Sequence, residues 1–195
     1  MSSLPSLDEI SASSPAADSP LATALSVFFE PSPILLNELV PQIASELDQT
    51  EISSYNDLID LSLNIISSSW DVTLKSQFIS GHPRIGEVKN LSHLSTKEQA
   101  TVATPPEVLA RLEELNRLYE KKYPGLRYIT FVNGQSRAMI VEEMEEFLGV
   151  GKGAVNLEEV EEVPNGSAEW RDELERAVVD VGRIARSRLK TLGVQ

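Results

Sequence analysis

The stretch SAEWRDELERAVVDVGRIARSRLKTL, residues 167–192, decides the fold class because it has the pattern of one long amphipathic helix. Its apolar side chains recur every three or four residues, the spacing of a single helical face; they are Trp170, Leu174, Ala177, Val178, Val181, Ile184 and Ala185. Seven residues after Val181, the same face carries Arg188. An arginine at this position must meet an anion inside the protein or extend to solvent near the helix end.

The same periodicity runs through most of the chain. It predicts helices over residues 20–30, 34–47, 55–69, 70–79, 105–122 and 136–148. The fifth helix is preceded by Thr104-Pro105-Pro106-Glu107, the pattern of an N-terminal capping box with proline at the first helical position. The run RYITFV, residues 127–132, is β-rich but has no partner strand, so we expect an extended connector. The sequence therefore predicts an all-α, single-domain helical bundle with one extended connector.

Domain limits follow from composition. Residues 1–20 are rich in Ser, Pro and Ala and predict an extended lead-in, which leaves a helical domain over residues 21–195. Within that domain, residues 149–166 are rich in Gly, Glu and Val and predict an acidic surface loop to which we assign no chemistry.

Charge and cysteine content exclude several classes of function. The chain has 30 acidic and 17 basic residues, a net charge of −13, which would repel phosphate backbones and anionic lipids. We therefore expect no nucleic-acid or membrane partner. The absence of cysteine and the presence of only two histidines argue against a metal site and against thiol chemistry. No secretory signal or membrane span is evident, so we expect a soluble cytoplasmic protein, with import into peroxisomes on a partner left open.

The candidate chemistry lies in GHPRIGEVKNLSHLSTKEQ, residues 81–99. His82 stands between glycine and proline, so its backbone is held in a non-helical turn. It suits a general acid or base, but a turn histidine bonded to a nearby carbonyl is the simpler interpretation. Ser95 and Glu98 could orient His82 and a substrate, although Ser-x-x-Glu is also a capping box with no further role. Arg188 is open between a structural pair with a buried glutamate and a clamp on a substrate carboxylate or ureide.

Four segments together resemble a known family. The GHPRIG turn (81–86), LSTKEQA (94–100), LNRLYEKKYPGLRYITFV (115–132) and IARSRL (184–189) occur in that order in the 2-oxo-4-hydroxy-4-carboxy-5-ureidoimidazoline (OHCU) decarboxylases of urate degradation. The resemblance covers roughly residues 20–192. It implies an all-helical, often dimeric enzyme without metal or organic cofactor, which acts on a small anionic ureidoimidazoline and yields S-allantoin.

The resemblance also implies roles for individual residues. It makes His82 the acid/base, paired with Glu98, and makes Ser95 and Arg188 substrate-binding residues. Further substrate contacts are implied for Pro83, Gln99, Ile129 and Phe131.

The chain departs from the family pattern at Arg84-Ile85 and in the altered connector run YPGLRY (123–128), and it lacks an additional arginine before the last helix. The exact substrate therefore stays open. Two alternatives are a non-catalytic module that binds ureides or a protein through residues 149–166, and a related enzyme for another small carboxylate.

Overall fold

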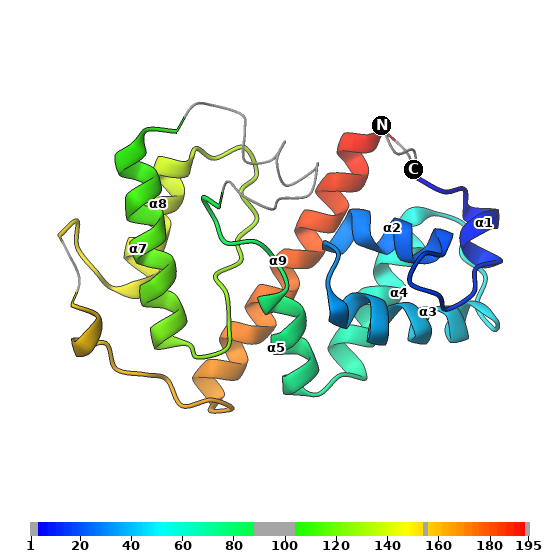
Figure 1. Cartoon of the computed structure of the whole chain (residues 1–195), viewed down its shortest axis with the longest axis horizontal. Helices are drawn as coiled ribbons and strands as arrows, with labels where there is room; N and C mark the ends of the chain where they lie inside the picture. The colour runs from blue at the N-terminus through cyan, green and yellow to red at the C-terminus, as the bar shows by residue number, and fades with distance from the viewer. Residues whose placement is uncertain (1–3, 88–103, 154–155, 194–195) are drawn as a thin grey trace.

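The computed structural model describes residues 4–87, 104–153 and 156–193 (Figure 1). In chain order its elements are α1 (Leu7–Ser11), α2 (Pro20–Phe29), the π-helical turn η1 (Leu35–Leu39), α3 (Val40–Leu47), α4 (Tyr55–Ser68), α5 (Val72–Ser80), α7 (Pro106–Lys122), α8 (Arg137–Leu148), the 3-10 turn η2 (Leu157–Glu159) and α9 (Ala168–Leu192). These ranges contain no strand, so the all-α prediction is confirmed.

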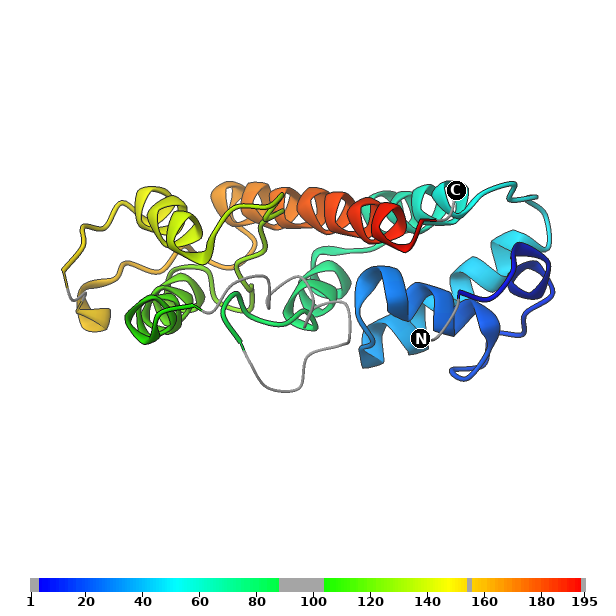
Figure 2. The same ribbon diagram turned by 90° about the horizontal axis from the view of Figure 1, so that it is seen from above.

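Helix α9 is the longest element; it crosses the middle of the view in Figure 1, and Figure 2 shows that it lies along one side of an elongated molecule. Its buried face packs against α2, α4 and α5, while α7 pairs with α8 at the other end of the molecule (Figure 1). The predicted apolar stripe is buried from Trp170 to Ala185 except for the half-buried Ile184, and Arg188 is buried with it. Ser167 caps the start of the helix with a side chain that accepts from the Trp170 amide, and Gly193 caps its end in the left-handed conformation.

The lead-in differs from the extended segment that its composition predicts. Ser6 and Glu9 form a capping box that starts α1, and Ile10 on this short helix is fully buried. The Tyr55 hydroxyl donates to the Pro5 carbonyl at 2.9 Å and ties the segment to α4. The segment folds despite its Ser/Pro content because its few apolar residues pack against the apolar face of α2.

The predicted capping box at Thr104 is wrong. Helix α7 begins one residue later than that pattern requires, with Pro105 as N-cap in an extended conformation and no side-chain cap. A proline disfavours the helical conformation of the residue before it, so Pro106 prevents Pro105 from being the first helical residue. The Thr104 hydroxyl instead accepts a hydrogen bond from Arg137 on α8 at 2.8 Å.

The helix predicted over residues 34–47 is divided. Residues 35–39 form a π turn in which the Val40 amide bonds to the Leu35 carbonyl, and α3 follows. Pro41 explains the widening, since proline has no amide hydrogen and its ring would clash with the carbonyl four residues earlier.

Residues 126–132 form an extended connector without strand pairing, as the sequence predicts.

The acidic segment after α8 is partly attached to the body, because the Val163 amide bonds to the Lys122 carbonyl at 2.8 Å and Val163 is buried. Within the described ranges, no helix is long and apolar enough to cross a membrane.

Candidate active site

His82 lies in a tight turn directly after α5. Its amide bonds to the Ile79 carbonyl at 3.1 Å, while Gly81 closes the helix by bonding to the carbonyls of Gln77 and Phe78. The ring is buried and packs edge-on against Phe78, with 5.1 Å between ring centroids. A side chain at position 81 would come within 2.9 Å of Ser32 Cβ, so the approach of the segment after α2 to this turn requires glycine.

The hydrogen bond of the imidazole defines its tautomer. Nδ1 of His82 lies 3.0 Å from the Phe78 carbonyl oxygen, and because a carbonyl only accepts, Nδ1 must carry the hydrogen. The pKa of His82 is lowered to about 4, chiefly by burial and in part by the nearby positive charge of Arg188, against the opposing Phe78 hydrogen bond and Glu30 charge. The ring is therefore neutral at pH 7. Its Nε2 lone pair is bonded to none of the residues that the structure describes, so it can accept a proton.

The turn is fixed to α7 by two independent contacts. Arg84 donates two hydrogen bonds of 2.6 Å to the carboxylate of Glu120, and Asn116 Nδ2 donates to the Ile85 carbonyl at 2.9 Å. Gly86 has φ +84°, and a Cβ there would lie 2.9 Å from Leu112 Cδ1. This position therefore requires glycine both for its backbone conformation and for the close approach of α7.

Arg188 lies close enough to His82 for its charge to lower the pKa of the histidine. Its Nη2 is 2.5 Å from Glu30 Oε1, and both side chains are buried. Its Nη1 donates to the carbonyls of Val27 and Phe28 at the end of α2, both at 3.3 Å. Of the two orientations that the helical face left open, the structure shows the inward one, and the contact found is the pair with a buried glutamate. Since Arg188 pairs with Glu30 in this structure, its role in substrate binding stays a proposal.

Glu30 is one residue of this cluster that sequence reasoning missed. It follows the last residue of α2 with φ +68°, a conformation that is uncommon for residues other than glycine. A carboxylate at a helix C-terminus is also opposed by the helix dipole. Two such costs at one buried residue indicate a position that is held by its partner, here Arg188. The sequence feature that could have pointed to Glu30 is its position directly after a predicted helix and before Pro31-Ser32-Pro33, which ends that helix.

The other predicted site residues are distributed as follows. Ser95, Glu98 and Gln99 lie outside the described residues. Pro83 follows His82 and is half-buried. Ile129 and Phe131 lie on the connector, the first buried and the second half-buried. The connector reaches the His82 turn through Arg127, whose Nη1 donates to the His82 carbonyl.

A buried polar network holds the connector against α8 and α9. Arg176 donates to the Ile129 carbonyl at 2.9 Å and also bonds to Glu173 and Asp180. The hydroxyls of Tyr128 and Thr130 both donate to Glu143 on α8 at 2.8 Å. The connector is thus fixed on both sides of Ile129, although it has no strand partner.

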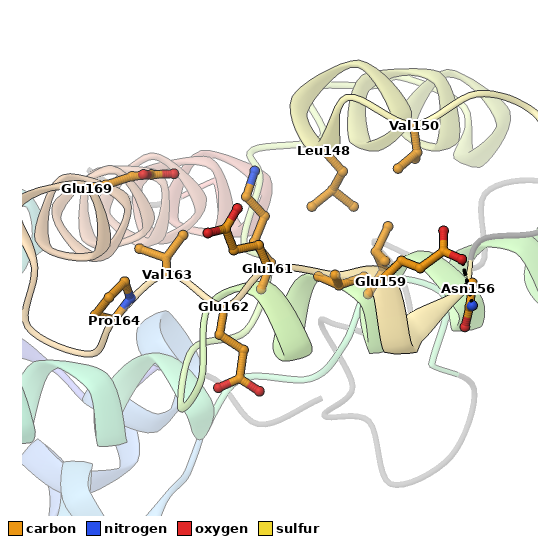
Figure 3. A pocket seen from close by; sticks show the side chains of 12 residues that line it. Leu148, Val150, Asn156, Glu159, Glu161, Glu162, Val163, Pro164 and Glu169 are labelled. Atoms are coloured by element: carbon orange, nitrogen blue, oxygen red, sulfur yellow. Dashed lines mark hydrogen bonds between the residues drawn. The ribbon is translucent and has the colours of Figure 1, made fainter.

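A separate cavity of about 630 Å³ lies between α7, the end of α8 and the acidic segment (Figure 3). Its walls include Leu148, Val150 and Val163, and its surroundings carry four carboxylates, those of Glu159, Glu161, Glu162 and Glu169. Of the predicted site residues that the structure describes, none lines this cavity. Carboxylates in this number would repel an anionic ligand, so we place the candidate chemistry at His82.

Comparison with known families decides the identity. A sequence profile described as OHCU decarboxylase matches residues 16–190. The chain belongs to the OHCU decarboxylase family. The family is one of carboxy-lyases that act in urate degradation, so this OHCU decarboxylase family member is a decarboxylase of that class.

Solved structures of similar fold agree with this assignment. A crystal structure of OHCU decarboxylase in the presence of (S)-allantoin is 21% identical, with a TM-score of 0.54, over 78% of this chain and 91% of that chain. A crystal structure of (S)-allantoin synthase is 16% identical, with a TM-score of 0.57, over 96% of this chain and 54% of that one. At these identities the likeness is one of fold. A search of curated proteins gives no significant match.

Among the described residues, no three His, Asp or Glu side chains are placed to hold a metal ion.

Proposed function

We propose that this protein converts 2-oxo-4-hydroxy-4-carboxy-5-ureidoimidazoline to (S)-allantoin without a cofactor, with His82 as the acid/base. The observation that carries this proposal is a buried, neutral imidazole in a member of a decarboxylase family. Because Nδ1 is occupied by the Phe78 carbonyl, the Nε2 atom is the one that exchanges protons with the substrate.

The reaction takes up one proton overall. The bond between the hydroxyl-bearing carbon and the carboxylate breaks, carbon dioxide leaves, and the electron pair forms a double bond to the ureido-bearing carbon while the ring nitrogen is protonated. His82 Nε2 then takes the hydroxyl proton as that oxygen becomes a carbonyl. The resulting imidazolium delivers a proton to the ureido-bearing carbon from one face, which yields a single enantiomer.

The remaining roles follow from the family resemblance. Glu98 would stabilise the imidazolium when it forms, and Ser95 would hydrogen-bond a polar group of the ring or ureide. Arg188 would bind and orient the substrate through oxygen atoms of the latter. Pro83, Gln99, Ile129 and Phe131 would shape the pocket.

The assay generates the labile substrate from urate with the two upstream enzymes and follows the circular dichroism of allantoin. We expect the purified protein to accelerate the signal and to give the S enantiomer in excess. A rate and an enantiomeric excess equal to those in buffer would refute the proposed function.

Assembly and location are proposals of the same kind. The family resemblance favours a homodimer, which light scattering would show as twice the chain mass of 21.5 kDa. Cytoplasmic residence, with possible import into peroxisomes, is testable by imaging the tagged protein in its host.

A further inference from the structure

Arg127 is a second cation at the His82 turn. Its Nη1 donates to the backbone carbonyl of His82, and its guanidinium is near enough to the imidazole for its charge to lower the pKa of His82. It comes from the connector, whereas Arg188 comes from α9. Two arginines on different elements thus approach the same histidine.

The two arginines differ in how their charge is compensated. Arg188 is buried and is paired with the carboxylate of Glu30. Arg127 is half-buried and makes no ion pair within the described ranges, 4–87, 104–153 and 156–193. A partly desolvated cation without a counter-ion favours the binding of an anion. Among the described residues, the charges that act on His82 are those of Arg127, Arg188 and Glu30, and these three together carry one positive charge in a protein of net charge −13.

The backbone that carries Arg127 is held in place. The next three residues of the connector, 128–130, are bonded to Glu143 and Arg176. A cation on a fixed backbone segment binds a ligand with a smaller loss of conformational entropy than one on a free loop.

We propose that Arg127 is the residue that binds the carboxylate of the substrate, while Arg188 bonds to neutral oxygen atoms. This assignment rests on the proposed decarboxylase function. The carboxylate is the one full negative charge of the substrate, and Arg127 is the arginine at His82 whose charge no described carboxylate compensates. Because the carboxylate loses its charge as carbon dioxide leaves, this contact stabilises the bound substrate more than the transition state.

The kinetic test compares three substitutions of Arg127. Arg127→Gln keeps a donor but loses the charge, Arg127→Met loses both, and Arg127→Lys keeps both. We expect Gln and Met to raise KM by tenfold to about a hundredfold with kcat within about threefold, and Lys to raise KM by less than about threefold. The control Arg117→Gln removes an exposed arginine paired with Glu113 and should leave KM unchanged. A KM for Arg127→Gln within twofold of wild type, or a rise equal to that of the control, would overturn the assignment.

A binding test separates this inference from the proposed function. Calorimetry would measure hydantoate, a ureide with one carboxylate, and its uncharged amide. We expect wild type to bind hydantoate at least tenfold more tightly than the amide, and Arg127→Gln to lose that preference. Equal preferences in the two proteins, or no hydantoate binding by wild type, would refute the role of Arg127. This outcome is independent of turnover, so an inactive wild type that still shows the preference would refute the decarboxylase proposal alone.

Discussion

At the scale of single residues, the cluster around His82 is governed by burial. Removal from water favours the neutral imidazole, and the Phe78 carbonyl selects the Nδ1–H tautomer. The sequence showed that His82 is held in a turn, because glycine and proline flank it. It did not show burial, which comes from packing against Phe78 and from the approach of Ser32 to Gly81.

The stability of the protein should depend on pH through His82. The pKa is about 4 in the folded state and about 6.5 when unfolded, so the folded state binds fewer protons between these values. The stability that the protein gains from keeping His82 neutral is fully present above pH 6.5 and is lost as the pH falls toward 4. Between pH 7.5 and 5, we expect wild type to lose about 2 kcal/mol more unfolding free energy than His82→Asn. Urea titrations at both pH values measure the difference, and equal losses would contradict a buried neutral histidine.

The pair of Glu30 and Arg188 gives a second prediction at this scale. Glu30→Gln removes the charge of Glu30 from its ion pair with the buried Arg188 and should cost about 3 to 5 kcal/mol of unfolding free energy. Arg188→Met should cost a similar amount. In the double variant we expect a loss at least 1 kcal/mol smaller than the sum of the two, because no buried charge remains unpaired. Strict additivity in urea titrations would show that the two side chains do not stabilise each other.

At the scale of elements, the helices could be predicted from the sequence, but the backbone conformations where helices begin and meet could not. Periodicity located α2, α4, α8 and α9 to within a residue or two of their observed ends. It could not show that Pro41 would widen the preceding turn into η1, or that Ser6 and Glu9 would start a helix in the lead-in. Such details depend on backbone hydrogen bonds and neighbouring surfaces, which residue spacing does not encode.

Attachment of the His82 turn to α7 can be tested at Gly86. Gly86→Ala adds a methyl group that meets Leu112 at 2.9 Å and forces alanine to φ +84°. Gly134→Ala is a matched control, because Gly134 has φ +79° and no neighbour within 4 Å. We expect the control to lose about 1 kcal/mol from the backbone alone and Gly86→Ala to lose at least 1 kcal/mol more. Equal losses in thermal unfolding would mean that α7 does not pack against the turn.

The connector offers a parallel test at Arg176. Arg176→Met leaves the buried carboxylates of Glu173 and Asp180 without this cation and frees the Ile129 carbonyl. We expect a loss of about 3 kcal/mol and faster hydrogen exchange over residues 127–132. Arg183→Met is the control, since Arg183 also bonds to Asp180 but is exposed and should cost less than about 1 kcal/mol. Unchanged exchange in Arg176→Met would show that another contact fixes the connector.

At the scale of the whole molecule, α9 connects the two ends of the fold and brings Arg188 to His82, 106 positions apart in the sequence. The all-α class and the family could be recognised from the sequence, because helical faces and the GHPRIG and IARSRL segments are local patterns. The approach of Glu30 and Arg127 to His82 could not, since it depends on how α2 and the connector pack. Packing of these elements therefore brings two arginines and one glutamate to the same histidine.

The central claim is that His82 transfers the proton that makes the product chiral. Wild type and His82→Asn would be compared in the urate-coupled assay by the circular dichroism of allantoin, with far-ultraviolet spectra to confirm equal helix content. We predict rapid formation of (S)-allantoin by wild type and a rate and enantiomeric excess no greater than those of buffer for the folded variant. Formation of (S)-allantoin by His82→Asn at the wild-type rate would contradict the account.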